Sequence, residues 1–293
     1  MRRGTQVKGI VLAGGTGSRL WPLTKVISKQ LLPVYDKPMI YYPISTLFLA
    51  GIRDIAIVTT PEEQSRFKSL LGTGSDWGVS FTYVAQAKPT GISDAFVLCE
   101  EFLAGSPSIL ILGDNLFVGA GLGKSLARFL DHTSGARILG YHVKNPSDYG
   151  VIEVDENLKV LTIQEKPAQP RSNLAIPGLY VVDSTAPEKA RQVQPSARGE
   201  KEITEFLSAY MLEDNLQIEV MQRGSAWMDM GNPLDLAATS DYIKVIEQRQ
   251  GTKISCPEEI AWRSGWITDA KLIELGNRLA PSSYGKYLGS LPR

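Results

Sequence analysis

The stretch VKGIVLAGGTGSRLWPLTKVISKQLLP, residues 7–33, begins as a short apolar strand and runs directly into a glycine-rich turn. The strand covers residues 9–12, the turn covers residues 13–18, and a helix is predicted to follow. The backbone N–H groups of such a turn lie close together, and with the positive end of the helix dipole they favour a bound phosphate. The stretch therefore predicts a nucleotide site.

The glycine spacing excludes two familiar kinds of nucleotide site. A dinucleotide fingerprint needs the pattern G-x-G-x-x-G, but counting from Gly15 its third glycine would fall on Leu20. A P-loop needs Gly-Lys-Ser/Thr at the end of the turn, whereas residues 17–19 read Gly-Ser-Arg. The turn instead carries its own arginine, Arg19, and Lys29 follows further along the chain.

Arg19 and Lys29 have the charges that a triphosphate requires. Arginine is planar and permanently charged and can hold two phosphate oxygens at once, whereas lysine is a compact charge on a flexible stem. Two such cations beside a triphosphate suit the electrostatic stabilisation of phosphoryl or nucleotidyl transfer. A glycine-rich turn with ordinary surface cations would show the same pattern, so the turn alone leaves both interpretations open.

The charge balance and the hydrophobic runs limit the class of protein. The 293 residues include 31 Lys plus Arg and 31 Asp plus Glu, so there is no basic excess that would indicate nucleic-acid binding. No apolar run approaches the ~20 residues that a membrane helix needs. The apolar segment that follows residues 1–3 is too short for a signal peptide. We therefore expect a soluble cytoplasmic protein.

Cysteine and histidine are scarce. Cys99 and Cys256 offer neither a disulfide framework nor a paired-cysteine metal site. His132 and His142 are too few for zinc chemistry or a histidine-centred triad, although one of them could serve as a base.

Strand and helix signals alternate through the first 120 residues. Strands are predicted over 7–12, 55–60, 79–85 and 108–112, and helices over 40–50, 62–71 and 93–102. Such alternation predicts a mostly parallel sheet with helices on both faces, in which ligands bind beyond the carboxyl ends of the strands. Residues 14–19, residues 86–91 and Asp114 all follow strands and should share one crevice.

Asp114 follows a buried strand and stands beside Asn115. A carboxylate at this position is well placed to hold Mg²⁺, which prefers oxygen ligands and shares them with substrate phosphates. An aspartate that caps the next turn would occupy the same position, so both interpretations stand.

Beyond residue 130 the pattern becomes rich in strands. Strands are predicted over 137–143, 150–154, 160–164, 174–182 and 216–221, a helix start over 197–204, and helices over 234–249, 257–264 and 268–279 before a short tail. Glu165 and Lys166 end a strand and have the donor and acceptor groups to bind a sugar, although an exposed ion pair is the commoner meaning of this dipeptide. Asp229 supplies a second carboxylate, close behind Trp227.

Several motifs are spread along nearly the whole chain. They are L-A-G-G-T-G-S-R-L-W-P-L-T from Leu12, S-K-Q-L-L-P-V-Y-D-K-P-M-I-Y-Y-P from Ser28, L-G-D-N from Leu112, Y-G-V-I-E from Tyr149, E-K-P from Glu165, P-S-A-R-G-E from Pro195 and S-C-P-E-E-I-A from Ser255. Together they resemble the motifs of the bacterial glucose-1-phosphate thymidylyltransferases, short-chain sugar nucleotidyltransferases that make dTDP-glucose.

The resemblance implies roles for the site residues. Arg19, Lys29 and Asp114 are implied to be catalytic, and Asp114 and Asp229 to be the Mg²⁺ ligands. Gln86 and Gly91 would read the thymine above Leu12 and Gly14, and Asn115, Gly150, Glu165 and Lys166 would hold the glucosyl phosphate. The other implied substrate-binding residues are Gly15, Thr16, Gly17, Gln30, Tyr149, Tyr180 and Trp227.

The resemblance also implies a fold, a reaction and partners. The fold would be a Rossmann-like α/β fold: a mixed, mostly parallel sheet flanked by helices, with a β-rich sugar-binding insertion. Residues 1–232 would form the core, divided near residue 130 into nucleotide- and sugar-binding parts, and residues 233–293 a helical region packed on it. The enzyme would condense dTTP with glucose 1-phosphate, feed dTDP-sugar synthesis such as that of dTDP-rhamnose, and form a homotetramer with a dTDP-sugar as feedback ligand.

Three departures from the family pattern keep alternatives open. Asp94 replaces an amide near the nucleoside, Pro177 removes a backbone N–H near the sugar, and residues 228–232 lack two hydroxyls around Asp229. The alternatives are the same chemistry with another pyrimidine triphosphate or a modified hexose phosphate, and a sugar-nucleotide-binding regulator with weak turnover.

Overall fold

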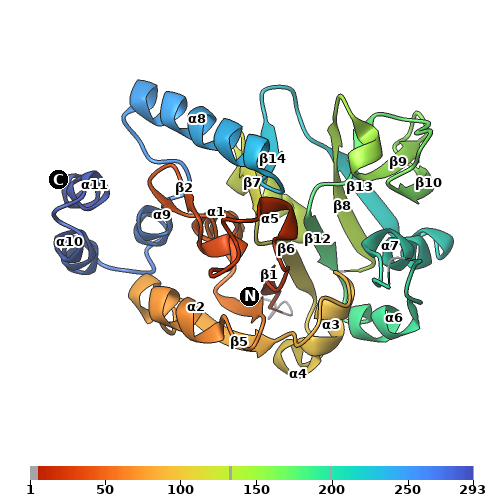
Figure 1. Cartoon of the computed structure of the whole chain (residues 1–293), viewed down its shortest axis with the longest axis horizontal. Helices are drawn as coiled ribbons and strands as arrows, with labels where there is room; N and C mark the ends of the chain where they lie inside the picture. Colours follow the sequence, from red (N-terminus) through yellow and green to blue (C-terminus); the bar gives the residue numbers. More distant parts are fainter. Residues whose placement is uncertain (1–5, 132–133, 198, 293) are drawn as a thin grey trace.

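A computed structural model describes residues 6–131, 134–197 and 199–292, and within these residues the chain forms a ten-stranded mixed sheet (Figure 1). The strand order is β10-β9-β11-β8-β12-β6-β1-β4-β5, and β13 pairs with β8. The strands of this sheet are β1 Lys8–Leu12, β4 Asp54–Thr59, β5 Ser80–Ala85, β6 Ser108–Leu112, β8 Ala136–His142, β9 Gly150–Val154, β10 Val160–Glu165, β11 Leu174–Ala175, β12 Leu179–Val182 and β13 Leu216–Val220.

Helices cover both faces of the sheet, and two small antiparallel pairs lie beside it (Figure 1). The pairs are β2 Pro33–Val34 with β3 Lys37–Pro38, and β7 Asn115–Val118 with β14 Ala226–Asp229. The helices are α1 Tyr41–Leu49, α2 Gln64–Leu71, α3 Asp94–Leu98, α4 Glu100–Leu103, α5 Leu122–Leu130, α6 Ala186–Gln192, α7 Ile203–Leu212, α8 Pro233–Gln250, α9 Pro257–Arg263, α10 Asp269–Arg278 and α11 Ser283–Ser290.

The first half of the sheet is parallel. β1 lies between β4 and β6 in parallel register, and β5 continues the same direction on the far side of β4. Because parallel strands end at one edge, the segments after β1, β5 and β6 meet there, as the alternating sequence pattern predicts. The second half of the sheet is mostly antiparallel and is joined to the first half by the β6–β12 pair. Strands from before and after residue 130 therefore belong to one sheet. The predicted mixed α/β fold is confirmed.

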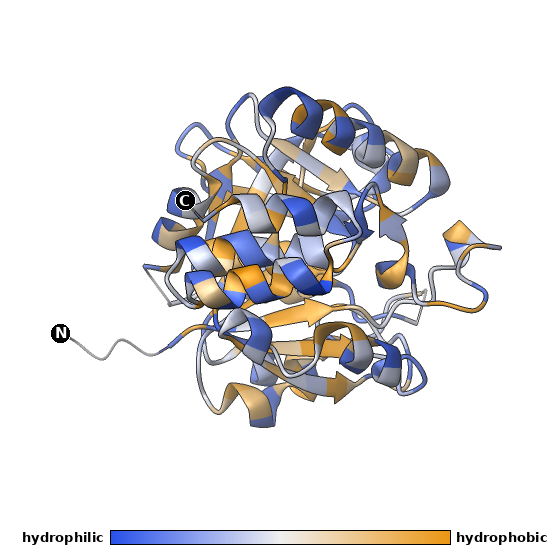
Figure 2. Ribbon diagram, turned by 90° about the vertical axis from the view of Figure 1, so that its left-hand side faces the viewer, coloured by the Kyte–Doolittle hydropathy of each residue, from blue (hydrophilic) through white to orange (hydrophobic). Residues whose placement is uncertain are grey.

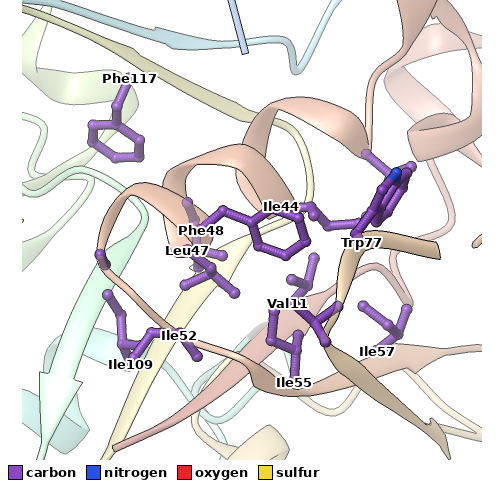
Figure 3. Packing of buried hydrophobic residues seen from close by; sticks show 14 of the residues in the cluster. Val11, Ile44, Leu47, Phe48, Ile52, Ile55, Ile57, Trp77, Ile109 and Phe117 are labelled. Atoms are coloured by element: carbon purple, nitrogen blue, oxygen red, sulfur yellow. The ribbon is translucent and has the colours of Figure 1, made fainter. Parts of the chain in front are cut away.

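Alternate residues of the central strands face two separate hydrophobic clusters. Val11 and Ile57 point to one face and Ile10 and Val58 to the other, and all four are fully buried. On the first face, side chains from α1 lie against the strands (Figure 3). The strands are mainly orange in Figure 2, whereas the helices in front of them mix hydrophobic and polar residues. A sheet buried on both faces explains the near-continuous apolar runs of β1, β4 and β6.

The C-terminal helices are joined to the N-terminal part of the chain by buried charges. Lys37 is the first residue of β3, in the β2–β3 hairpin. Its ammonium lies 3.4 Å from the carboxylate of Glu247 on α8 and 2.6 Å from that of Asp36. Lys253 contacts both carboxylates, at 2.7 Å from Glu247. Two lysines and two carboxylates thus neutralise one another, which is what a buried charged cluster requires. Among the described residues, no helix combines the length and apolarity needed to cross a membrane.

The prediction of a helix directly after the glycine-rich turn is wrong. Only a three-residue 3-10 helix, Ser18–Leu20, follows the turn, and Trp21 is extended with φ −60° and ψ 141°. Pro22 explains this end, because the residue before a proline is driven away from helical dihedral angles. No long helix therefore directs its dipole at the turn, and an anion there would be held by the N–H groups and cations of the turn itself.

Other element boundaries also differ from the sequence expectation. The helix expected over 93–102 divides at Cys99, whose ψ of 5° leaves the helical range. The strand expected over 174–182 divides into β11 and β12, because Pro177 has no N–H and Gly178 donates its N–H to a side chain instead of a neighbouring strand. In the helix start expected over 197–204, residue 198 lies outside the described residues and α7 begins only at Ile203, while the expected tail contains α11.

Candidate active site

The β7–β14 pair brings the two predicted metal carboxylates together. Asp114 precedes β7, Asp229 ends β14, and in this antiparallel pair Asp229 lies opposite Asn115. The N–H of Met230 donates to the carbonyl oxygen of Asp114 at 3.0 Å, which fixes the two chain segments side by side. Residues more than a hundred positions apart in sequence thus place two carboxylates at the end of β6.

Asp114 forms an ion pair with Lys29, which lies in the short 3-10 helix Lys29–Leu31. The side chains are 17% and 7% exposed, so water screens the pair little. Burial alone would raise the pKa of the Asp114 carboxyl, but the Lys29 ammonium and a hydrogen bond from Asn115 outweigh it and hold that pKa below its usual value. Asp114 is therefore ionised and Lys29 is held beside it.

Asp229 has the opposite electrostatic environment. Burial, followed by the negative charge of Asp114, raises the pKa of Asp229 to about 6, although Lys29 and Arg19 partly compensate. The Arg19 guanidinium and this carboxylate both lie against Gly231. A β-carbon on Gly231 would be 3.0 Å from an Arg19 nitrogen and 3.1 Å from Asp229 Oδ1. Two carboxylates that repel each other between two cations form a site that gains from an added divalent cation.

Asn115 orients the groups around Asp114. Its amide nitrogen donates to Asp114 Oδ1 at 2.9 Å, and its amide oxygen accepts from Trp227 Nε1 at 2.6 Å and from the N–H of Gly178 at 3.1 Å. All these donors and acceptors are satisfied inside the protein, since Asn115 is fully buried. The strand break at Pro177 thus frees the Gly178 N–H to fix the side chain that positions Asp114.

A cavity of about 190 Å³ lies beside these residues. Ten of the predicted site residues line it: Arg19, Asp114, Asn115, Tyr149, Gly150, Glu165, Lys166, Tyr180, Trp227 and Asp229. Its walls are aromatic on one side, where the Tyr149 and Trp227 rings meet edge to face with centroids 5.0 Å apart. Aromatic walls with a few charged groups are typical of pockets for small polar ligands.

Lys166 has a backbone conformation that is unusual for lysine. Its φ is +42°, in the left-handed region, and its N–H donates to the carbonyl oxygen of Tyr149 at 3.1 Å. Such strain is concentrated at ligand sites, where the surrounding structure imposes it. It turns the chain so that Glu165 and Lys166 both face the cavity.

The predicted nucleoside residues follow two neighbouring strands, β1 and β5. A β-carbon on Gly14 would lie 2.6 Å from Gln86 Oε1, so the buried Gln86 side chain rests on this glycine. Gly91 has φ +119°, and a β-carbon there would lie 2.3 Å from the carbonyl oxygen of Lys201. Position 91 therefore requires glycine, whereas at position 14 a methyl group would displace the end of the Gln86 side chain.

The remaining predicted residues are distributed around the turn. Gly15 and Thr16 line a polar hollow of about 380 Å³ that also includes Arg66, and Gly17 has φ +62°. Leu12 ends β1, and its carbonyl oxygen accepts from the N–H of Gly113 at 2.9 Å. Gln30 is buried, where its amide oxygen accepts from Ser28 Oγ at 2.8 Å.

Sequence reasoning missed several residues of the cavity wall. These are Ile92, Leu112, Asp148, Ile176, Gly178, Ile203 and Thr204. Thr204 also donates to Glu165 Oε2 at 3.3 Å. The motif at residues 195–200 lies shortly before Thr204 and was a signal, but for residues 197–204 themselves the sequence predicted only a helix start. His142, at the end of β8, pairs with Asn173 at 2.9 Å, and His132 lies outside the described residues.

Known proteins match this chain over most of its length. Residues 8–245 match the family model described as nucleotidyl transferase. The glucose-1-phosphate thymidylyltransferase of Xanthomonas campestris is 50% identical over 289 residues, covering 99% of this chain and 98% of the relative. That of Neisseria meningitidis is 47% identical over 282 residues, covering 96% and 98%.

Solved structures show the same fold. A Bacillus anthracis protein described as a glucose-1-phosphate thymidylyltransferase, in complex with a sucrose, superposes with a TM-score of 0.75 at 40% identity, over 80% of this chain and 94% of that one. A UDP-glucose pyrophosphorylase with UDP-glucose superposes with a TM-score of 0.73 at 23% identity, over 82% and 99%, and supports the fold alone. With its family model and near-full-length relatives, the chain belongs to the nucleotidyl transferase family, among the glucose-1-phosphate thymidylyltransferases.

Proposed function

We propose that the enzyme condenses dTTP with glucose 1-phosphate to give dTDP-glucose and pyrophosphate. The observation that carries the proposal is the arrangement of Lys29, Asp114, Asp229 and Arg19 beside a cavity lined with groups that can bind a sugar. The same reaction is named for relatives that match nearly the full length of the chain.

The reaction needs charge neutralisation more than acid–base chemistry. An oxygen of the sugar phosphate attacks the α-phosphorus of dTTP in line, a P–O bond forms, and the bond to the bridging oxygen of the β-phosphate breaks to release pyrophosphate. The attacking oxygen is already anionic, so no base has to remove a proton. Lys29 and Arg19 would oppose the charge that accumulates on the phosphoryl oxygens, and positioning of the two substrates supplies ~7–11 kcal/mol in well-oriented reactions.

The carboxylates Asp114 and Asp229 fit a magnesium ion. Both offer only oxygen ligands. Burial and then the negative charge of Asp114 raise the pKa of Asp229, and a bound cation would offset both effects. Two protein ligands are what Mg²⁺ takes when substrate phosphates complete its shell. When bound, the metal would neutralise phosphate charge, as in other phosphoryl-transfer enzymes. Asn115 would hold the Asp114 carboxylate in orientation through its 2.9 Å hydrogen bond.

The cavity beside the carboxylates has the groups that a hexose phosphate requires. Glu165 can accept hydrogen bonds from hydroxyls, and the ammonium of Lys166, which is partly exposed, can pair with the phosphate. Tyr149 and Trp227 provide aromatic walls on which the apolar face of a sugar ring can lie. We propose that the sugar phosphate binds here and that the thymine binds at Gln86 and Gly14.

The function is tested by pyrophosphate release with Mg²⁺ and glucose 1-phosphate, with dTTP, UTP, CTP and GTP compared at equal concentration. We expect the highest kcat/KM with dTTP. A higher value with another triphosphate or another hexose phosphate would replace the proposed substrates. Absence of turnover with every pair, in a chain that still binds sugar nucleotides, would favour the regulator interpretation.

Replacing Gly14 by alanine is expected to raise the KM for dTTP about tenfold while the chain keeps its stability. The new methyl group would displace the end of the Gln86 side chain, which lies only 2.6 Å from its position. Because that end is flexible, folding tolerates the shift, but a misplaced hydrogen-bonding group costs about 1–2 kcal/mol of recognition. Steady-state kinetics measure the effect.

A double-mutant cycle shows whether the glycine acts through Gln86. Gln86→Ala should raise the KM for dTTP by itself, and adding Gly14→Ala to it should change the KM little further. Additive effects of the two substitutions would contradict this mechanism.

Metal binding is expected to weaken as the pH falls through about 6. Only the ionised Asp229 carboxylate binds a cation, and its pKa is raised to about 6, so it is charged at pH 8 and mostly protonated at pH 5. Protons then compete with the metal, and affinity should fall about tenfold per pH unit below the pKa. Calorimetric titration of the free chain with Mg²⁺ at pH 5 to 8 measures this. The Asp229→Asn variant should lose the dependence, and equal affinities at pH 5 and 8 would refute it.

The homotetramer, the dTDP-sugar feedback ligand, the role in dTDP-rhamnose synthesis, the cytoplasmic location and the domain division near residues 130 and 232 stay predictions from the resemblance.

A further inference from the structure

Two loops that border the site are joined at Lys201. The first follows β5 and contains Gly91, and the second precedes α7. The N–H of Lys201 donates to the carbonyl oxygen of Thr90 at 2.8 Å, and Ser93 Oγ donates to the carbonyl oxygen of Lys201 at 3.0 Å. The absence of a side chain on Gly91 permits this approach. The backbones of the two loops are therefore in direct contact beside α3 and α7 (Figure 1).

Side-chain charges reinforce this junction. The Lys201 ammonium lies 3.4 Å from Asp94 Oδ1, and Thr90 Oγ1 donates to Asp94 Oδ2 at 2.5 Å. The two charged side chains are 23% and 19% exposed, so they are partly shielded from water. The carboxylate of Asp94 thus binds one group from each loop. This explains how an acidic residue is accommodated near the proposed nucleoside site.

Each loop continues into a wall of the site. Ile92, from the first loop, and Thr204, in the first turn of α7 directly after the second loop, both line the cavity of about 190 Å³. Thr204 donates to Glu165 at 3.3 Å and also packs against Gly150, where its methyl carbon is 2.9 Å from the position of a β-carbon. The junction at Lys201 therefore connects the loop of Gly91, a proposed nucleoside residue, to the segment whose Thr204 contacts the proposed sugar-phosphate residue Glu165.

We infer that the Asp94–Lys201 pair is a positioning device that holds the nucleoside loop in register with the wall of the sugar-phosphate pocket. This rests on the function proposed above. Neither side chain lines the cavity, so both act through the loops that they join. Loosening the pair should let the first loop leave its bound position, which lowers the fraction of the chain ready to bind and raises KM in proportion. The reacting groups are unaffected once both substrates are bound.

The test is a set of three variants. Asp94→Asn and Lys201→Met each remove one charge at nearly constant size, and both should raise the KM for dTTP about fivefold with kcat within twofold of the unmodified chain. The double variant should have the same KM as either single variant, because the pair is lost only once. Lys201→Arg keeps the charge and should restore most of the affinity.

The matched control is Lys189→Met. Lys189 is another partly buried lysine, 15% exposed and paired with Glu213, but it lies on α6 away from the cavity. Its replacement should leave both KM values unchanged. Hydrogen exchange should show faster exchange over residues 86–94 in the Asp94 and Lys201 variants and not in the control.

The outcomes separate this inference from the proposed function. Absence of turnover by the unmodified chain with any triphosphate would refute the proposed function and the inference together. Normal turnover, with a dTTP KM in both single variants within twofold of the unmodified value, would refute the positioning role alone. A fall in kcat at unchanged KM would also overturn it, because the pair would then act on the chemical step.

Discussion

Lys29→Ala is expected to lower kcat about a thousandfold. In the structure the Lys29 ammonium lies against Asp114 in a buried setting, where one charge stabilises a transition state far more than it does in water. Loss of one such preorganised group costs 10²–10³-fold or more in comparable sites, by order of magnitude. The measurement is pyrophosphate release under saturating substrates, with the folded state verified by circular dichroism and thermal unfolding.

The variant also tests the ion pair itself. Removing Lys29 leaves Asp114 as a buried charge without its partner, and breaking such a pair typically costs about 3–5 kcal/mol of stability. The double variant Lys29→Ala/Asp114→Asn should recover part of this stability without recovering activity. A kcat for Lys29→Ala within tenfold of the unmodified value, in a folded chain, would show that another cation opposes the developing charge.

Asp114→Asn is expected to reduce kcat by a similar factor of about a thousand, for a different reason. The amide has the same shape, but it loses the negative charge that would hold Mg²⁺ and that fixes the Lys29 ammonium. We expect Mg²⁺ affinity and kcat to fall together, which calorimetry and steady-state kinetics measure separately. Near-normal Mg²⁺ affinity in this variant would show that Asp114 is not a metal ligand.

An exposed ion pair provides matched controls for both substitutions. Lys159 and Asp214 lie 2.8 Å apart, and their side chains are 61% and 78% exposed. Neither lines the cavity. Lys159→Ala and Asp214→Asn should therefore leave kcat unchanged. A large loss in these variants as well would mean that the effects at Lys29 and Asp114 are general consequences of lost charge.

The parallel half of the sheet could be predicted from local sequence patterns alone. Runs such as residues 55–60 are apolar and β-branched, and a strand buried on both faces needs nothing more. The position of Asp114 after such a strand was also sufficient to place it at the carboxyl edge of the sheet, where the structure has it. The resemblance then supplied roles for Arg19, Lys29 and Asp229 that residue patterns left open.

Contacts between distant segments could not be predicted in this way. Asp229 meets Asp114 only because β14 pairs with β7, and no local pattern specifies which short strands pair. Thr204 faces Glu165 and Lys201 faces Asp94 for the same reason, since each contact depends on how two loops are brought together. The short 3-10 helix at Ser18 was missed because the effect of Pro22 on the preceding residue outweighed the helix signal.

The buried cluster of Lys37, Asp36, Glu247 and Lys253 has a consequence for the time at which the enzyme matures during translation. The ribosome makes Lys37 some 210 residues before Glu247. The charged residues of the proposed catalytic centre, which are Arg19, Lys29, Asp114 and Asp229, are all made before α8. Until α8 and Lys253 are made, Asp36 pairs with Lys37 in the hairpin that follows Lys29, but Glu247 and Lys253, which complete the buried cluster, are missing. A nascent chain therefore contains all the proposed catalytic residues before the buried cluster that ties this hairpin to α8 can form.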